Sequence, residues 1–120
     1  MAGVLYPTRY NKAMFAVHLT ASFDAWLLAL RDLKGRTAIA RRIERMSEGN
    51  FGDAKPVGDG ISELRVDFGP GYRVYFTVRG RQVVIVLAGG DKSSQARDIA
   101  RAKALLATLA RPGLSGKKAE

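Results

Sequence analysis

Residues 61–79 read ISELRVDFGPGYRVYFTVR, and this stretch decides the fold. Apolar and polar side chains alternate on both sides of Gly69-Pro70-Gly71, with the period of two that half-buried strands show. A Gly-Pro-Gly sequence marks a turn. The stretch therefore predicts two antiparallel strands, residues 61–68 and 72–79, joined by a short turn.

The alternation also predicts which polar side chains of this hairpin lie together. Both apolar sets lie on one face only if the paired residues have numbers with an even sum. The shortest register of this kind places Asp67 opposite Arg73 and Arg65 opposite Tyr75. Arg65, Arg73 and Tyr75 then share the face away from the core, and Arg79 extends the row. This basic and aromatic surface suits RNA phosphates and bases. The alternative is a solvated face with an Asp67–Arg73 pair, in which truncation of Arg73 costs at most about 1 kcal/mol.

The neighbouring segments predict the rest of the sheet. Residues 82–88 (QVVIVLA) are apolar on both faces, which suits an interior strand that ends at Gly89-Gly90-Asp91. Residues 13–19 (AMFAVHL) predict a short first strand. Residues 50–60 are rich in turn residues, and a short extended piece at 54–57 is the alternative there.

Apolar residues at helical spacing predict the helices. The first helix begins near Thr20 or Ser22 and is ended by Lys34-Gly35, and the second covers residues 36–48. The last runs from Ser93 or Ser94 to about residue 110. The predicted fold is α+β: a small antiparallel-rich sheet with an N-terminal αα-hairpin and a C-terminal helix, in the order β-α-α-β-β-β-α. Residues 1–12 are expected to form an irregular arm, 13–110 one domain, and 111–120 a disordered tail.

Composition restricts the functional class. The chain has 120 residues with 20 Lys and Arg against 11 Asp and Glu, a net charge of +9. This excess favours nucleic acid, an anionic membrane or an acidic protein as partner. There is no Cys and one His, which excludes disulfides and thiol nucleophiles and argues against a metal site. No apolar run is long enough to span a membrane and no signal peptide is visible, so we expect a cytoplasmic protein that starts at Met1 or Met14.

A second candidate site is the sequence GGDKSS at residues 89–94, between the interior strand and the last helix. Backbone N–H groups at a helix start can hold a phosphate, and Lys92 can add a charge. The spacing differs from that of a P-loop. A simple strand-to-helix turn with a serine cap is the alternative.

Two long segments resemble a known family. NFGDAKPVGDGISELRVDFGPGYRVYFTVRG (50–80) and VVIVLAGGDKSSQARDIARAKAL (83–105) resemble the RelE/ParE superfamily of type II toxins, and FDAWLLALRD (23–32) agrees with it. GPGYRVYF and GGDKSSQxxDIxxAK are specific to the HigB-like branch, whose members are often labelled addiction-module killer proteins. The resemblance implies a RelE-like fold and ribosome-dependent mRNA cleavage without a cofactor. It also implies a helix-turn-helix antitoxin, without which the toxin binds no operator DNA.

The resemblance also implies the site residues. Arg65 matches the basic residue of the strand before the GYR turn, Arg73 the Arg of GYR, and Lys92 the basic residue of the final turn. Arg73 would clamp the phosphate in the transition state, while Arg65 and Lys92 would share charge stabilisation or proton transfer. The predicted RNA-binding residues are Lys55, Tyr75 and Arg79.

Two positions depart from the ribosome-dependent pattern. Asp67 stands where relatives have a second Lys, and Asp98 stands where they have a catalytic Tyr. These departures leave two alternatives open. One is a ParE-like inhibitor of DNA gyrase that performs no chemistry, and the other is an inactive remnant that serves as an antitoxin-bound co-repressor.

Overall fold

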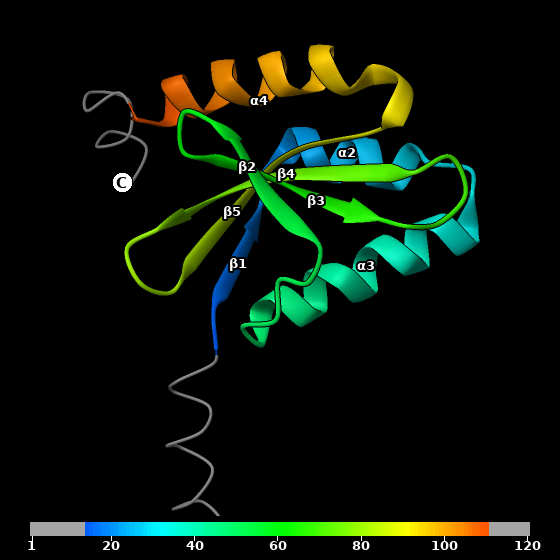
Figure 1. Ribbon diagram of the computed structural model, residues 1–120, viewed down its shortest axis with the longest axis horizontal. Coiled ribbons are helices and arrows are strands. Elements are labelled where there is room, and N and C mark those ends of the chain that lie inside the picture. Colours follow the sequence, from blue (N-terminus) through cyan, green and yellow to red (C-terminus); the bar gives the residue numbers. More distant parts are fainter. Residues whose placement is uncertain (1–13, 111–120) are drawn as a thin grey trace, which may run out of the picture.

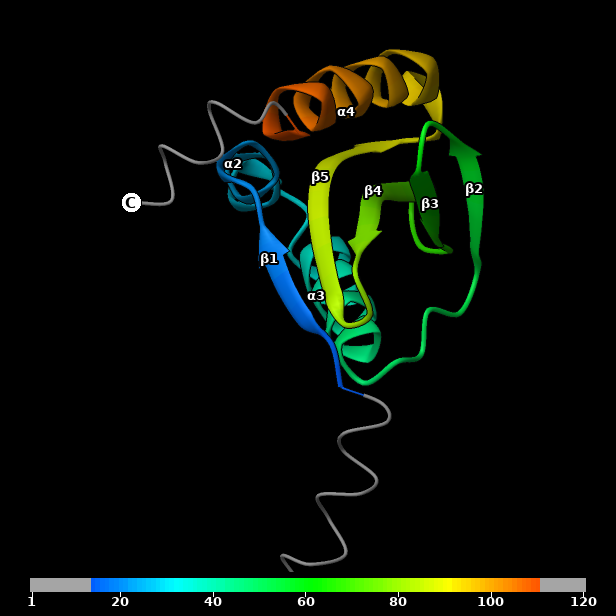
Figure 2. The ribbon, with the colours of Figure 1, turned by 90° about the vertical axis from the view of Figure 1, so that its left-hand side faces the viewer.

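A five-stranded sheet forms the centre of the computed structural model, which describes residues 14–110 (Figure 1). Its strands are β1 (Ala16–Leu19), β2 (Ala54–Gly58), β3 (Ile61–Val66), β4 (Tyr72–Arg79) and β5 (Val83–Asp91). The spatial order is β1-β5-β4-β3-β2, with β1 parallel to β5 and the other neighbours antiparallel. The view in Figure 2 shows β1 and β2 at opposite edges of the sheet. The predicted arm (1–12) and tail (111–120) lie outside the described residues.

Helices cover both faces of the sheet. α2 (Ala21–Ala29) and α3 (Leu33–Ser47) pack on one face, and α4 (Gln95–Ala110) packs on the other (Figure 1). The core under α2 and α3 is built around these buried residues: Phe23, Ile39, Met46, Leu64, Val66, Tyr72, Val74, Phe76, Val84 and Val86. The core under α4 is built around Ile61, Tyr75, Leu87, Ala88 and Ala102. Within residues 14–110, no helix has both the length and the apolar character needed to cross a bilayer.

The α+β class, the antiparallel-rich sheet and the C-terminal helix are confirmed, but the predicted order lacked one strand. Residues 54–58 form β2, which pairs with β3 and gives the order β-α-α-β-β-β-β-α. Its sequence, AKPVG, contains a proline and has little apolar character, because β2 is an edge strand whose outer side needs no partner. The extended piece considered at 54–57 is therefore the correct interpretation of this segment.

The break between the first two helices also differs from the prediction. α2 ends at Ala29, and Asp32 caps α3 by accepting a hydrogen bond from the Gly35 N–H (2.9 Å). Gly35 therefore lies in the first turn of α3 and does not end a helix. A glycine is required at position 35 because there is no room for a side chain: an added Cβ would lie 2.6 Å from both the Asp32 carboxylate and the Tyr72 ring. The Tyr72 hydroxyl donates to Asp32 (2.8 Å), which fastens this turn to the sheet.

Strand β5 continues through Gly89 and Gly90, which were expected to end it. A Cβ at Gly89 would overlap the Trp26 ring of α2, and a Cβ at Gly90 would overlap the Asp98 carboxylate of α4. The two glycines therefore allow a helix to approach the end of β5 closely from each side. Their purpose is packing rather than a turn.

Candidate functional site

One cross-strand row brings the main predicted site residues together. Arg65 on β3 lies directly opposite Arg73 on β4, and Arg73 lies opposite Gly90 on β5. The Arg65 N–H donates a hydrogen bond to the carbonyl of Asp53, just before β2 (2.9 Å). Paired residues point to the same side of a sheet, so the two arginine side chains stand next to each other. They lie on the face that α4 partly covers.

The predicted hairpin register was wrong by two residues. Arg65 pairs with Arg73 rather than with Tyr75, and Asp67 follows the end of β3 instead of facing Arg73. The connection is longer than the shortest one, because Phe68 and Gly71 close turns of their own with N–H to carbonyl bonds of 2.8 and 3.1 Å. A shift of two leaves each strand residue on its predicted face.

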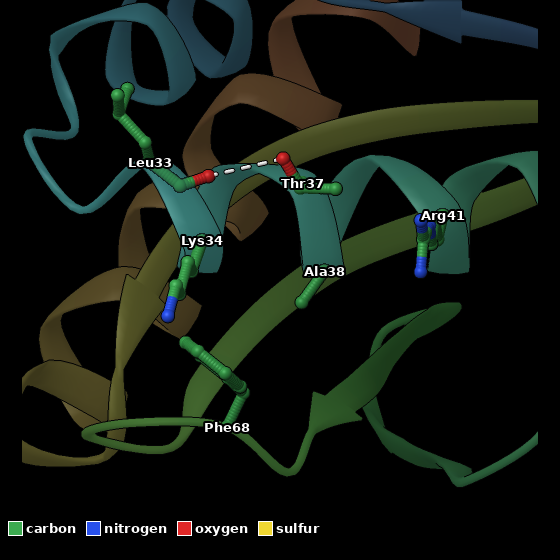
Figure 3. Close-up of a pocket in the computed structure, with 6 residues that line it drawn as sticks. All are labelled: Leu33, Lys34, Thr37, Ala38, Arg41 and Phe68. Carbon is green, nitrogen blue, oxygen red and sulfur yellow. Dashed lines mark hydrogen bonds between the residues drawn. The ribbon is translucent and has the colours of Figure 1, made fainter.

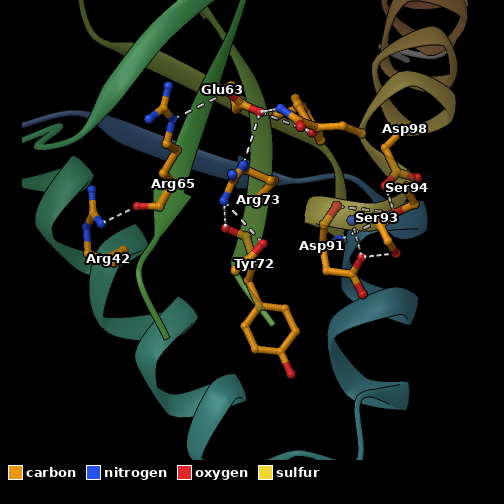
Figure 4. Close-up of polar contacts among 12 residues, drawn as sticks. Arg42, Glu63, Arg65, Tyr72, Arg73, Asp91, Ser93, Ser94 and Asp98 are labelled. Atoms are coloured by element: carbon orange, nitrogen blue, oxygen red, sulfur yellow. Dashed lines mark hydrogen bonds and ion pairs between the residues drawn. The ribbon is translucent and has the colours of Figure 1, made fainter. Parts of the chain in front are cut away.

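A buried carboxylate lies between the two arginines. Glu63 is fully buried, with Oε2 3.3 Å from Arg73 Nε and Oε1 3.8 Å from Arg65 Nε (Figure 4). The Tyr75 hydroxyl donates to Oε2 (3.4 Å), and the Gln95 side-chain amide also donates to it. Like charges directly opposite each other on two strands repel. Glu63 is the counterion that allows Arg65 and Arg73 to stand side by side.

Arg73 is held in one orientation. Its Nη1 donates to the carbonyls of Gly71 (3.2 Å) and Tyr72 (3.4 Å), and its side chain is 12% exposed against 39% for Arg65. Its Nε faces Glu63 as an ion pair without an aligned hydrogen bond. Nη2 has no acceptor in the described part of the chain. A guanidinium fixed in this way is preorganised to donate to an anion.

A polar pocket of about 300 Å³ opens at this row. It is lined by Asp53, Arg65, Asp67, Gly71, Arg73 and Lys92. The three predicted catalytic residues therefore meet at one opening. A Cβ at Gly71 would lie 3.5 Å from Arg73 Nη1 and 3.6 Å from Lys92 Cβ, so these two side chains approach each other over the glycine. Three cations and two carboxylates give the lining a net charge of +1, which complements the single negative charge of a phosphodiester.

Lys92 is positioned by the turn between β5 and α4. It is the first residue of the short helix η1 (Lys92–Ser94), and its side chain is exposed. Asp91 caps this turn by accepting from the Ser93 N–H (2.8 Å), and the Asp91 N–H donates to the Ser94 hydroxyl (3.4 Å). Asp91 thus caps η1, and α4 begins at Gln95, directly after Ser94. The Ser93 hydroxyl bond lowers the pKa of Asp91, which stays ionised and fastens the turn.

The predicted RNA-binding residues do not form one surface. Lys55 is exposed on β2 opposite Glu63, one strand away from the arginines, and Arg79 is exposed at the far end of β4. Tyr75 was expected on an exposed face, and this was wrong: it is fully buried. The reason is that the apolar side of α4 needs a sheet face to cover, and Tyr75 belongs to that second core.

Burial determines the chemistry of Tyr75. It raises the pKa of the phenol, and the nearby charges of Glu63 and Asp98 raise it further. The hydroxyl therefore stays protonated and serves as a donor to Glu63. Tyr75 therefore stabilises Glu63, the carboxylate that contacts both arginines, and it is not available to stack on a base.

Asp98 is also a structural residue. It is 2% exposed, accepts a hydrogen bond from the Ser94 hydroxyl and lies 3.7 Å from Arg101 Nη1. At the position where a catalytic Tyr was considered, the chain thus has a carboxylate turned into the α4–β5 contact. It does not line the pocket.

Sequence reasoning missed Glu63, Gln95 and Asp53. The alternation of residues 61–68 places Glu63 on the polar face of its strand, beside Arg65 and Asp67, but it does not show that Glu63 is buried. A signal was present, because two arginines on one sheet face need an anion between them. Gln95 and Asp53 carry no such signal, since their contribution depends on how α4 and β2 pack.

The amino-acid sequence matches a known protein family and a bacterial relative. The model of the family described as "Phage derived protein Gp49-like (DUF891)" matches residues 25–107. A protein of Haemophilus influenzae (strain ATCC 51907 / DSM 11121 / KW20 / Rd), described as "Uncharacterized protein", is 50% identical over 93 residues. The match covers 78% of this chain and 94% of that protein. No solved structure matches the chain significantly.

Proposed function

Since the chain belongs to the Gp49-like family of phage-derived proteins, we propose that it is the toxin of a type II toxin–antitoxin system and that it cleaves mRNA on the ribosome. The family is associated with toxin–antitoxin modules and with RelE-like proteins. This agrees with the resemblance of residues 50–80 and 83–105 to the HigB-like branch of the RelE/ParE superfamily. The proposed place of action is the cytoplasm.

The observation that carries the proposal is the composition of the pocket. Arg65, Arg73 and Lys92 supply three cations, while Asp53 and Asp67 supply two carboxylates at the same opening. Carboxylates oppose simple anion capture, whereas an ionised carboxylate can accept a proton as a general base. The combination fits acid–base chemistry on a phosphodiester better than binding alone.

In the proposed reaction, the ribose 2′-oxygen attacks the adjacent phosphorus. Its proton passes to a rim carboxylate, Asp53 or Asp67. Arg73 and Arg65 stabilise the charge that develops on the phosphorane oxygens. The bond to the 5′-oxygen then breaks, and the Lys92 ammonium donates a proton to that oxygen. The products are a 2′,3′-cyclic phosphate and a 5′-hydroxyl, which balances atoms and protons without a cofactor.

The test is induction of the chain alone in a bacterial host, with Lys92→Ala beside the wild type. We expect growth arrest and new mRNA 5′ ends at ribosomal A sites for the wild type, and neither for Lys92→Ala. Arg81→Ala is the matched control, because Arg81 is exposed in the β4–β5 turn and does not line the pocket. Equal cleavage by all three proteins would contradict the assigned site.

Gyrase inhibition is the second candidate, and Asp98 favours it. This residue stands where RNA-cleaving relatives have a Tyr, and its carboxylate is buried and hydrogen-bonded. The same induction experiment separates the two functions. A DNA-damage response with intact mRNA would support the gyrase inhibitor, and a harmless chain would support the co-repressor remnant.

The proposed partner is a helix-turn-helix antitoxin encoded beside this gene. A net charge of +9 favours rapid association with a partly acidic protein. Co-expression of the neighbouring gene should restore growth and yield a stable complex. If the neighbour's product neither rescues growth nor co-purifies, the toxin–antitoxin assignment is wrong.

A further inference from the structure

A groove runs along one side of α3. Its larger part, about 470 Å³, lies between the helix and Phe68 of the β3–β4 turn (Figure 3). It is lined by Leu33, Lys34, Thr37, Ala38, Arg41 and Phe68. A second part of about 320 Å³ shares Ala38, Arg41 and Phe68 and continues to Arg42, Arg45, Val66 and Asp67. We refer to both parts together as the α3 groove.

The α3 groove has exposed apolar walls. Leu33 is 63% exposed and Phe68 is 37% exposed, although both are large apolar side chains. Figure 3 shows the Phe68 side chain pointing toward Lys34 on the helix. Apolar side chains gathered in a concave surface and bordered by charge are typical of a protein-binding site. Neither Leu33 nor Phe68 contributes to the two cores of the fold.

The rim of the groove is strongly basic. Lys34, Arg41 and Arg45 are exposed along it, while Asp67 is the single carboxylate among its lining residues. Arg42 is anchored by hydrogen bonds from Nη1 to the Arg65 carbonyl (2.7 Å) and from Nη2 to the Phe51 carbonyl (3.1 Å). Burial lowers the pKa of the Arg42 guanidinium, and the neighbouring charge of Arg45 lowers it further. An occupant of this groove must bring negative charge.

The length of the groove sets the size of the occupant. Its lining on α3 extends from Leu33 to Arg45, which at 1.5 Å per residue is about 18 Å. Three turns of an α-helix cover the same distance. An amphipathic helix of that length places its apolar face in such a groove through residues at spacings of three and four.

We propose that the α3 groove is the docking site for an acidic amphipathic helix of a partner protein. The apolar face of that helix packs on Leu33, Ala38 and Phe68. Its carboxylates meet Lys34, Arg41 and Arg45. A second copy of this chain is a poor occupant, because it carries a charge of +9 itself.

The position of the groove links docking to inhibition. Asp67 lines both the α3 groove and the polar pocket that contains Arg65, Arg73 and Lys92. A helix seated in the groove therefore lies beside the opening where RNA would enter. That the docked partner is the neutralising antitoxin rests on the proposed function, whereas the docking itself does not.

The probe is a fluorescein-labelled synthetic peptide of about 14 residues, with leucines at helical spacing and glutamates beside them. Its binding to the full chain is measured by fluorescence anisotropy at about 0.15 M salt. We expect Leu33→Glu and Arg41→Glu each to weaken binding at least about tenfold. The matched control is Leu28→Glu, since Leu28 is 64% exposed on α2 and lies outside the groove. It should bind within about twofold of the wild type.

The proposal is overturned if the glutamate peptide does not bind, or if Leu33→Glu and Leu28→Glu bind it equally. It is also overturned if a peptide with lysines in place of the glutamates binds as tightly. The affinity of a short single-stranded RNA is measured for the same variants. If Leu33→Glu weakens the binding of this RNA more than it weakens the binding of the peptide, the groove is an RNA site instead. The assay contains no cleavage step. A harmless chain that still binds the peptide would therefore refute only the proposed function.

Discussion

Replacing Arg73 with alanine should destabilise the protein through Glu63. At 3.3 Å, the Arg73 and Glu63 charges attract by about 5 kcal/mol at an effective dielectric constant of about 20, before any cost of desolvation. Removing one partner of a buried pair costs about 3–5 kcal/mol. Arg65, Tyr75 and Gln95 remain beside Glu63 and offset part of this loss.

We therefore expect Arg73→Ala to lower the free energy of unfolding by about 2–3 kcal/mol, or roughly 10 °C in melting temperature. This value exceeds the limit of about 1 kcal/mol that follows from an exposed Asp67–Arg73 pair. The assay is urea unfolding followed by circular dichroism. Arg81→Ala is the control and should stay within about 0.5 kcal/mol of the wild type.

A double-mutant cycle isolates the charge of Glu63. Glu63→Gln keeps the shape of the side chain but removes its charge, so Arg73→Ala on that background should cost less than about 1 kcal/mol. The coupling energy should then exceed about 1 kcal/mol. If Arg73→Ala costs no more than Arg81→Ala, or costs the same on both backgrounds, Arg73 is not the counterion of Glu63.

Two further predictions concern stability alone. Burial of Tyr72 and its hydrogen bond to Asp32 raise the pKa of the phenol to about 12, above the usual 10. The unfolded chain therefore loses this proton at a lower pH than the folded protein does. The free energy of unfolding should fall as pH rises from 10 to 12. In a pH series of urea unfolding curves, Tyr72→Phe should reduce the slope of stability against pH in this range, while Tyr75, whose pKa is also raised, keeps a slope of the same sign. An unchanged slope would contradict the assignment. Gly90→Ala should cost at least about 2 kcal/mol in the same assay, since its Cβ would overlap the Asp98 carboxylate. Gly80→Ala is its control and should cost about 1–2 kcal/mol, because the positive φ of 62° strains a side chain there although nothing lies within 4 Å of the added Cβ. Equal costs would show that Gly90 has room for a side chain.

Local patterns predicted much of the fold. The alternation in residues 72–79 predicted β4 with its observed bounds, Tyr72–Arg79, and the apolar run at 82–88 predicted an interior strand, observed as β5 (Val83–Asp91). These predictions succeed because a strand that is buried on one face alternates apolar and polar side chains, and a strand that is buried on both faces is apolar throughout. The edge strand β2 was omitted from the predicted order because an edge needs little apolar character.

The site was predictable only in part. Arg65 and Arg73 could be assigned to one face because a strand alternates with a fixed period. The burial of Tyr75 and Glu63 could not be predicted, because it depends on which part of the sheet α4 covers. Likewise, the register depends on turn hydrogen bonds at Phe68 and Gly71 that the shortest connection does not contain.

We propose that Arg65, Arg73 and Lys92 act on one RNA phosphate. Replacing Lys92 gives the clearest test of this claim, because the Lys92 side chain is exposed and its removal leaves the Glu63 network intact. The measurement is the single-turnover rate of cleavage of ribosome-bound mRNA by the purified protein. We predict that Lys92→Ala cleaves on the order of 10²–10³ times more slowly than the wild type while melting at the same temperature. A Lys92→Ala protein that cleaves as fast as the wild type would contradict the claim.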